Sequence, residues 1–260
     1  MRKLDKLGRR AGAAALAPLA SVALVASPAH AATASVRLTF SSMTNDGSAP
    51  LNVDIARSGG GTVSTKSDAA WLGQVGRTPS FNAQKGAPRG VLRLTAKSGD
   101  PLSPGSRSFS FGADVLLDSG TTASHTSGST DNGDNVVQRG RYGDQGQYKI
   151  QVDGRRPSCR VKGSSGAVLV KSSVSLAAGT WYQITCTRSG TAVTLQVLRF
   201  TSTGAVAATT KTTGYGATGS VLAPGSRPMS VGGKLTTSGQ VATDSDQFNG
   251  RVDNVVLTIS

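Results

Sequence analysis

Glutamate is absent from this chain: all 14 acidic residues among its 260 are aspartates. Any chemistry that needs two carboxyl groups, such as the hydrolysis of glycosides, would therefore have to use aspartates alone. Two close pairs are Asp114 with Asp118, which flank an apolar triplet, and Asp244 with Asp246, in a polar stretch. Neither spacing is specific for a catalytic pair, so the sequence disfavours glycoside hydrolysis.

Histidine is nearly absent as well, since only His30 and His125 occur. A Ser-His-Asp triad would have to use His125, which lies in a polar stretch rich in Ser, Thr and Gly. The chain also lacks the Gly-x-Ser-x-Gly motif that would present a nucleophilic serine. An exposed loop histidine is the simpler interpretation, and nucleophilic catalysis of this type is disfavoured.

The first 31 residues have the pattern of a secretory signal peptide. An apolar run at 11–27 is followed by Ala29, His30 and Ala31, a small-x-small cleavage site, and preceded by the basic residues Arg2, Lys3, Lys6, Arg9 and Arg10. We therefore expect a signal peptide over 1–31 and a mature domain over 32–260 that is secreted and extracellular. A membrane anchor is the alternative, although the apolar run is short and contains Pro18.

The export route stays open, because a bare Arg9-Arg10 pair is compatible with twin-arginine export but does not specify it. A composition rich in Ala and Gly, with more Arg than Lys, favours a bacterial source. We expect no membrane association after cleavage.

Cysteine occurs only twice, as Cys159 and Cys186. In an exported chain a disulfide is the natural interpretation, and both residues fall in strand-like phrases that can reach bridging distance. Closing this loop of about 28 residues would stabilise the fold by on the order of 3 kcal/mol. A catalytic thiol is the alternative, but no suitable histidine accompanies it.

Basic residues outnumber acidic residues by 28 to 14, so the formal net charge is +14 at pH 7. Removal of residues 1–31, with five Lys or Arg and one Asp, leaves +10. Such a surplus favours acidic partners, for example anionic polysaccharides or other acidic cell-surface polymers. The alternative is that the charge only keeps the protein soluble. No helix-turn-helix, RNA-recognition or zinc-finger pattern occurs, which disfavours nucleic acid as a partner.

Helical periodicity is missing after the first segment, and short strand-like phrases separated by Gly, Ser, Asn, Asp and Pro take its place. They lie at 35–40, 51–56, 90–95, 108–117, 135–140, 147–152, 158–162, 179–188, 191–200, 229–233 and 251–259. In 191–200, Val193, Leu195 and Val197 alternate with polar residues, as in a strand with one face on a core. No linker or repeat interrupts the series, so we predict one all-β domain, a two-sheet antiparallel β-sandwich.

In order and spacing, the phrases at 108–117, 135–140, 147–152, 179–188 and 248–257 resemble the laminin-G-like jelly-roll family of the concanavalin A-like lectin/glucanase superfamily. The resemblance covers roughly residues 35–260 and is loose between 62 and 89. It departs from the family at 196–200, where relatives carry Tyr-Val-Asp-Gly. It implies a jelly roll, a fold that carries glycan-binding modules, adhesion modules and glycosidases alike. The Glu-x-Asp-x-x-Glu strand of the glucanases cannot exist here.

Calcium is the cofactor that the aspartates suggest. Asp131 and Asp134 lie in a run with Asn132 and Asn135, and such oxygens suit a hard cation. The resemblance adds Asp253, at a position where some relatives have a calcium ligand. The alternatives are an Asx-type turn at 131–135 and, for Asp253, a carboxylate that caps backbone N–H groups or pairs with an arginine.

Aromatic residues make up only 5% of the chain, which leaves few rings for stacking on sugars. We expect Trp71, Tyr142 and Tyr215 to be the ligand contacts, because Trp71 lies in a loop-like region and the two tyrosines lie beside glycines. The resemblance implies that Trp181 is a core residue. The long loop at 118–134 and the turn around 214–216 should gather at the ends of the sandwich, where functional loops cluster.

We therefore expect a secreted, non-catalytic, lectin-like module that binds a carbohydrate or an acidic cell-surface polymer. The alternative is an adhesion or interaction module with a protein partner. A third possibility is a polysaccharide lyase on an anionic glycan, with Tyr142 or Tyr148 as the base and Arg139 or Arg141 at the uronate. The sequence names neither the ligand nor the oligomeric state.

Overall fold

The computed structural model describes residues 34–68, 73–77, 88–118, 134–242 and 246–260, all within one compact unit that spans 31–260. The predicted signal peptide, Trp71, His125, Asp131 and Asp244 lie outside these ranges. Every regular element in the described ranges is a strand, and none of these residues belongs to a helix that could span a membrane.

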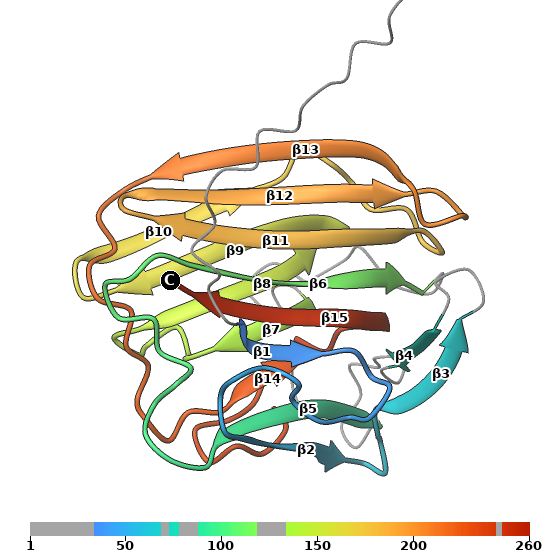
Figure 1. The fold of residues 1–260 in the computed structure, drawn as a ribbon, viewed down its shortest axis with the longest axis horizontal. Coiled ribbons are helices and arrows are strands. Elements are labelled where there is room, and N and C mark those ends of the chain that lie inside the picture. The colour runs from blue at the N-terminus through green and yellow to red at the C-terminus, as the bar shows by residue number, and fades with distance from the viewer. Residues whose placement is uncertain (1–33, 69–72, 78–87, 119–133, 243–245) are drawn as a thin grey trace, which may run out of the picture. The chain divides into compact units, whose positions relative to one another are not determined.

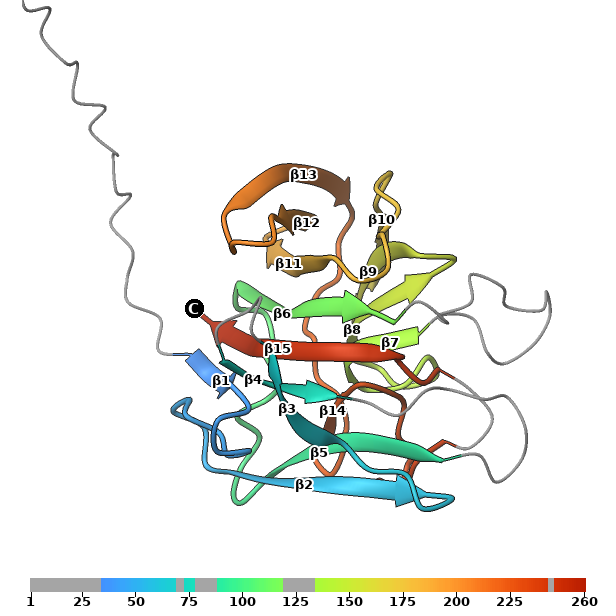
Figure 2. The ribbon, with the colours of Figure 1, turned by 90° about the vertical axis from the view of Figure 1, so that its right-hand side faces the viewer.

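The strands form two antiparallel sheets that pack face to face (Figures 1 and 2). The eight-stranded sheet contains, in spatial order, β13 (Val206–Tyr215), β12 (Ala192–Phe200), β11 (Trp181–Ser189), β6 (Phe109–Leu117), β15 (Gly250–Ile259), β4 (Gly73–Arg77) and β3 (Ser64–Asp68), with β1 (Ala34–Leu38) paired to β15. The seven-stranded sheet contains β10 (Gly166–Lys171), β9 (Arg156–Gly163), β8 (Gln147–Asp153), β7 (Asp134–Arg139), β14 (Met229–Val231), β5 (Arg89–Ala96) and β2 (Leu51–Ser58). The predicted two-sheet antiparallel sandwich is thereby confirmed.

Alternation of apolar and polar residues builds the core between the sheets. In β6, Phe109, Phe111 and Val115 face inward, and in β11 the inward residues include Ile184. The Phe109 and Phe111 rings pack against the buried ring of Tyr148 from the opposite sheet, with centroids 5.7 and 4.9 Å away. The residues between these inward positions must point away from the core, so each sheet presents one outer face.

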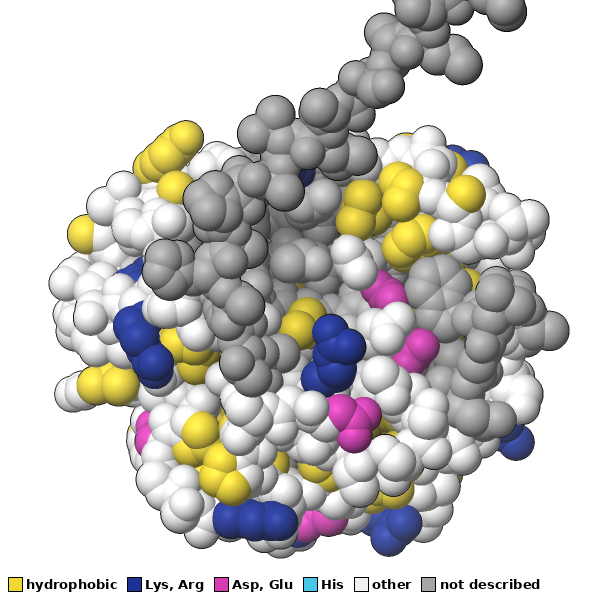
Figure 3. Space-filling model, viewed as in Figure 1, with side chains coloured by type: hydrophobic (Ala, Val, Ile, Leu, Met, Phe, Trp, Pro, Cys, Tyr) yellow, Lys and Arg dark blue, Asp and Glu magenta, His cyan; other side chains and the backbone are white. Residues whose placement is uncertain are grey.

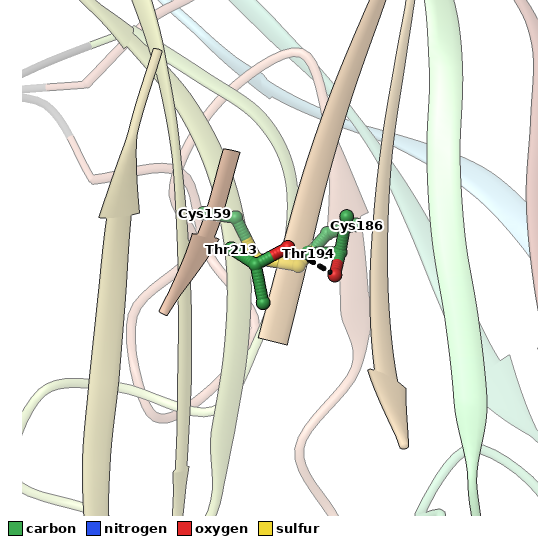
Figure 4. Close-up of a disulfide and its surroundings, with 4 residues drawn as sticks. All are labelled: Cys159, Cys186, Thr194 and Thr213. Atoms are coloured by element: carbon green, nitrogen blue, oxygen red, sulfur yellow. Dashed lines mark hydrogen bonds between the residues drawn. A yellow bond between two sulfur atoms is a disulfide. The ribbon is translucent and has the colours of Figure 1, made fainter. Parts of the chain in front are cut away.

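The two cysteines form the predicted disulfide. Cys159 of β9 and Cys186 of β11 are fully buried, with Cα atoms 6.1 Å apart, and they link the two sheets through the core (Figure 4). Thr194 and Thr213, drawn beside the bridge, share a 2.9 Å hydrogen bond between their hydroxyl groups across β12 and β13. The disulfide therefore links one sheet to the other near the edge strands.

Strands β10 and β13 were missing from the sequence-based prediction, as were β3 and β4. β13 is a long strand of mostly Ala and Thr whose side chains are largely exposed, so it has no apolar alternation to reveal it. Its backbone pairs with β12 along its whole length, from Val206 opposite Phe200 to Tyr215 opposite Ala192. Backbone pairing with a regular neighbour, rather than its own side chains, makes this segment a strand.

Candidate binding site

One row of side chains crosses the outer face of the seven-stranded sheet. Cross-strand pairing aligns, from β10 to β2, the residues Leu169, Arg160, Lys149, Gln138, Ser230, Arg93 and Asp54. Their chain neighbours in β8 and β9, such as Ile150 and Cys159, face the core. The row is therefore polar, and its cations lie on neighbouring strands.

The arginine near one end of this row is neutralised, because Arg93 forms a bidentate pair with Asp54 at 2.8 and 2.9 Å. Arg160 and Lys149, by contrast, form no salt bridge with a carboxylate in the described ranges, and neither does Lys162 in the adjacent row. The part of the face over β8 and β9 thus carries cations that form no salt bridge with a described carboxylate.

The pKa of Lys149 is shifted by its surroundings. Burial lowers its pKa to about 8, Asp246 and Asp153 oppose this effect, and the neighbouring cations Lys234 and Arg160 add to it. Asp246 also forms an ion pair with Lys234, whose ammonium group lies 2.6 Å from the Asp246 carboxylate. An anion placed near Lys149 and Arg160 would relieve the repulsion between them.

An exposed aromatic ring stands beside these cations. Tyr142 is 79% exposed, and the Arg160 guanidinium carbon lies 4.8 Å from the centre of its ring. The ammonium group of Lys162 donates a 3.0 Å hydrogen bond to the backbone oxygen of Tyr142. A ring held against a cation gives both a flat apolar surface and a charged edge.

The turn that carries Tyr142 is fixed by its own residues. Gly140 has φ of +77°, and a Cβ atom there would lie 2.1 Å from a backbone oxygen across the turn, so only glycine fits. The Asp144 carboxylate accepts a 2.8 Å hydrogen bond from the Arg141 backbone N–H and pairs with Arg227 at 2.9 and 3.1 Å. The Arg227 hydrogen bonds hold the pKa of Asp144 below its ordinary value. The ring is therefore presented by a pinned segment.

A carboxyl pair lies on the outer face of the other sheet, where Asp253 of β15 stands opposite Asp114 of β6. Asp114 accepts hydrogen bonds from the side-chain amides of Gln183 (3.1 Å) and Asn254 (2.7 Å). Burial raises its pKa to about 6 despite these bonds. The pair that the fold creates is thus Asp114 with Asp253, not Asp114 with Asp118.

The predicted calcium ligands are only partly covered by the described residues. Asp253 belongs to the eight-stranded sheet and Asp134 to β7 of the seven-stranded sheet, while Asp131 lies outside the described residues. Within the described ranges, no three His, Cys, Asp or Glu side chains form a group that could hold a metal ion. Asp114 with Asp253 offers two carboxyl groups, fewer oxygens than the roughly six to eight that Ca²⁺ takes. Calcium binding stays a prediction.

Two of the residues suggested for a lyase are structural, which corrects that expectation. Tyr148 is buried in the core, its hydroxyl donates a 3.1 Å hydrogen bond to the Leu102 carbonyl, and burial raises its pKa well above the ordinary value. Arg139 is also buried and binds Ser103 and Asp100. Neither side chain can contact a glycan, so Tyr148 cannot act as the base of a lyase and Arg139 cannot bind the uronate.

The expected contact residues are distributed over different parts of the fold. Tyr142 joins the cations of the seven-stranded sheet, whereas Tyr215, 77% exposed, lies at the end of β13 in the other sheet. Trp71 lies outside the described residues. Trp181 is only 5% exposed, as expected, but it packs with Leu116 in a small cluster on the outer face rather than in the main core.

The cations of β8 and β9 were missed by sequence reasoning. A signal for them was present, because Lys149 lies between Tyr148 and Ile150, and Arg160 lies between Cys159 and Val161. A cation flanked by apolar residues in a strand points away from the core. The pattern shows that each points outward, but only the pairing of β8 with β9 shows that they are neighbours.

Residues 135–259 match the family described as Laminin G domain. No curated protein matches the chain significantly. Among solved structures, domain 4 of an extracellular arabinanase from Geobacillus stearothermophilus, in complex with arabinotriose, is similar at a TM-score of 0.54 and 13% identity, over 88% of this chain and 93% of that one.

Two further solved structures share the fold. The enzymatically active domain of tailspike protein 2 from bacteriophage CBA120 has a TM-score of 0.51 and 12% identity, over 86% of this chain and 31% of that one. The binding domain of botulinum neurotoxin serotype G has a TM-score of 0.51 and 9% identity, over 86% of this chain and 47% of that one. The chain thus spans less than half of either, and identities this low show the fold alone. Together with the family match over 135–259, the two-sheet architecture shows that the domain has the fold of a laminin-G-like jelly roll.

Proposed function

We propose that this domain is an exported, non-catalytic module that binds an acidic polysaccharide on the outer face of its seven-stranded sheet. The observation that carries the proposal is the position of Tyr142 beside a group of cations. These cations, Arg160, Lys149 and Lys162, form no salt bridge with a described carboxylate. The cations attract carboxylate or sulfate groups, and the exposed ring stacks on a sugar face.

Adjacent strands are about 4.8 Å apart, so Arg160 and Lys149 present two charges at a short, regular spacing across the sheet. A polymer that runs perpendicular to the strands can place successive acidic groups near successive cations. An isolated small anion would engage fewer of them. The site therefore favours a chain with repeated charges over a single acidic sugar.

Known proteins with this fold support a binding role in general terms. The arabinanase domain was solved with arabinotriose, and the botulinum neurotoxin domain is named a binding domain. The disulfide supports export, since such bonds persist in oxidising surroundings outside the cytoplasm. The acidic polymer is suggested by the charges of this chain and not by those relatives.

A protein partner is the second candidate function. Leu169 is 53% exposed and lies directly opposite Arg160 in the same row, so the cations border an apolar side chain. A protein interface commonly combines such features. The two functions differ in salt dependence, because binding of a charged polymer weakens steeply with ionic strength and apolar contact does not.

The test is retention of the purified protein on polygalacturonate, dextran sulfate and uncharged dextran, at low and high salt and with calcium or chelator. We expect retention by an acidic polymer at low salt that falls at high salt, with Arg160→Ala and Tyr142→Ala each weakening it. Tyr215→Ala is the matched control, because Tyr215 is equally exposed but lies on the other sheet. No retention by either acidic polymer, or retention that Arg160→Ala leaves unchanged, would contradict the proposal.

A further inference from the structure

We propose that the outer face of the eight-stranded sheet holds a second, separate binding site, a cleft for the ring of a neutral saccharide. The cleft has a volume of about 410 Å³ and lies where β6, β11 and β12 meet β15 and β3. Figure 3 looks onto this face and shows hydrophobic side chains at upper right with acidic side chains below them. Ligand sites typically occupy about 300–1,000 Å³, so the cleft is large enough for a small sugar.

Apolar side chains form one wall of the cleft. Trp181 of β11 and Leu116 of β6 are cross-strand partners that pack together, and Phe200 of β12 packs against both while staying partly exposed. These residues lie on the outer face, so burying the main core does not explain them. An apolar wall that includes the face or edge of aromatic rings suits the C–H face of a sugar ring.

A balanced ion pair forms the base of the cleft. The Asp68 carboxylate pairs with Arg251 at 2.5 Å and accepts a 3.3 Å hydrogen bond from the indole N–H of Trp181. Asp68 is buried, so its position is set by these partners and not by solvent. The pair offers both an acceptor and donors at fixed positions while carrying no net charge.

Polar residues form the rim of the cleft. Arg199 at the end of β12 is exposed and forms no salt bridge with a carboxylate of the described ranges. Thr180, Thr201 and Ser202 line the same opening. Hydroxyl, guanidinium and carboxylate groups around one apolar wall match a ligand with one apolar face and an edge of hydroxyl groups.

The balanced pair at the base of the cleft argues for a neutral ring there, with Arg199 left at the rim. An anionic group placed deep in the cleft would approach the Asp68 carboxylate, and a cationic group would approach Arg251. A neutral polyol ring meets neither penalty and can exchange hydrogen bonds with both. This site therefore differs in ligand charge from the cationic face on the other sheet. Its existence does not depend on binding of an acidic polymer there.

The experiment uses the two tryptophans of the chain, Trp71 and Trp181, as reporters. In a Trp71→Phe variant the only remaining indole is that of Trp181, in the wall of the cleft. Cellotriose, xylotriose, maltotriose and tri-galacturonic acid are then titrated while its fluorescence is followed. We expect a saturable change with at least one neutral trisaccharide, unaffected by salt, and a weaker response to the acidic one.

Variants decide whether the response comes from the cleft. Phe200→Ala should weaken binding about tenfold, the effect of losing one ring contact. Arg199→Ala changes only an exposed rim residue and should also weaken it, which covers the case in which Phe200→Ala unfolds the protein. Tyr142→Ala, on the opposite sheet, should leave it unchanged. The proposal is overturned by a flat titration with all three neutral trisaccharides, or by a response that Arg199→Ala does not alter in a folded protein.

Discussion

Asp114 shows how a single side chain can make the stability of this domain depend on pH. It is buried on the outer face of the eight-stranded sheet, between the amides of Gln183 and Asn254, and opposite Asp253. Burial disfavours its charged form and raises its pKa to about 6. Because this folded-state pKa exceeds the ordinary value of 3.8, folding binds the proton.

This residue predicts a pH effect with a definite sign. The stabilisation from the bound proton is complete below about pH 4 and is lost as the pH rises through about 6, at a cost on the order of 3 kcal/mol. As the pH rises from about 4 to about 7, the free energy of unfolding should therefore fall less in Asp114→Asn than in the unmodified protein. Urea unfolding of both proteins across that range measures it. Parallel pH profiles for the two proteins would show that Asp114 does not bind the proton.

At the scale of elements, the turn at 140–146 shows why an exposed ring can still be well placed. Tyr142 contributes little to the core, but the residues around it are held by Gly140 and by the pair of Asp144 with Arg227. A ring on a pinned turn loses less conformational freedom when a ligand binds. The position of the ring is therefore set by residues that need not touch the ligand.

We predict that Asp144→Ala weakens acidic-polymer binding about three- to tenfold, because the Tyr142 turn loses the Asp144 bonds to the Arg141 backbone N–H and to Arg227 and must be ordered on binding. The folded-state pKa of Asp144 is lowered, so the pair persists at neutral pH and is lost only as the pH falls through that lowered value. Affinity electrophoresis on polygalacturonate measures the effect. The matched control is Asp54→Ala, which removes the carboxylate of the Arg93 pair near the far end of the same row. Loss of a carboxylate by itself favours an acidic polymer, so Asp54→Ala should not weaken binding, and equal or stronger binding in Asp144→Ala would contradict the role of the turn.

Elements also differ in how far their sequence reveals them. The alternation of Val193, Leu195 and Val197 identifies β12, because one face of this strand is buried. The neighbouring strand β13 is exposed and shows no such pattern, so only its pairing with β12 defines it. Edge strands of this type are difficult to predict because backbone hydrogen bonds carry no side-chain signature.

At the scale of the whole molecule, the disulfide is the covalent link between the two layers. Cys159 and Cys186 belong to opposite sheets and are 27 residues apart in sequence. The bond limits the unfolded chain more than a short cross-link would, and this is the main source of its stabilisation.

We predict that Cys159→Ser with Cys186→Ser lowers the free energy of unfolding by roughly 3 to 4 kcal/mol. Buried hydroxyl groups left without partners would add to this loss. Urea unfolding of the variant measures the effect, and the unmodified protein under reducing conditions serves as the comparison. A loss below about 1 kcal/mol would mean that the core alone fixes the two sheets together.

The two proposed sites also divide the molecule by charge. The cations Arg160 and Lys149 lie on one sheet, and the neutralised pair of Asp68 with Arg251 lies on the other. Binding of an acidic polymer should therefore depend strongly on salt, whereas binding of a neutral trisaccharide should not. Measuring both ligands on one sample at several salt concentrations checks this. A shared salt dependence would indicate one common site.

The sequence by itself determined the all-β class, the laminin-G-like resemblance and the disulfide, and its lack of glutamate ruled out the glucanase motif. These properties follow from composition and from local alternation, which each segment carries in its own residues. Only the tertiary structure decided that Tyr148 and Arg139 are buried and that Asp68 meets Arg251 and Trp181. The reason is physical: which side chains become neighbours depends on the pairing and register of strands far apart in the chain, and no single segment encodes that register.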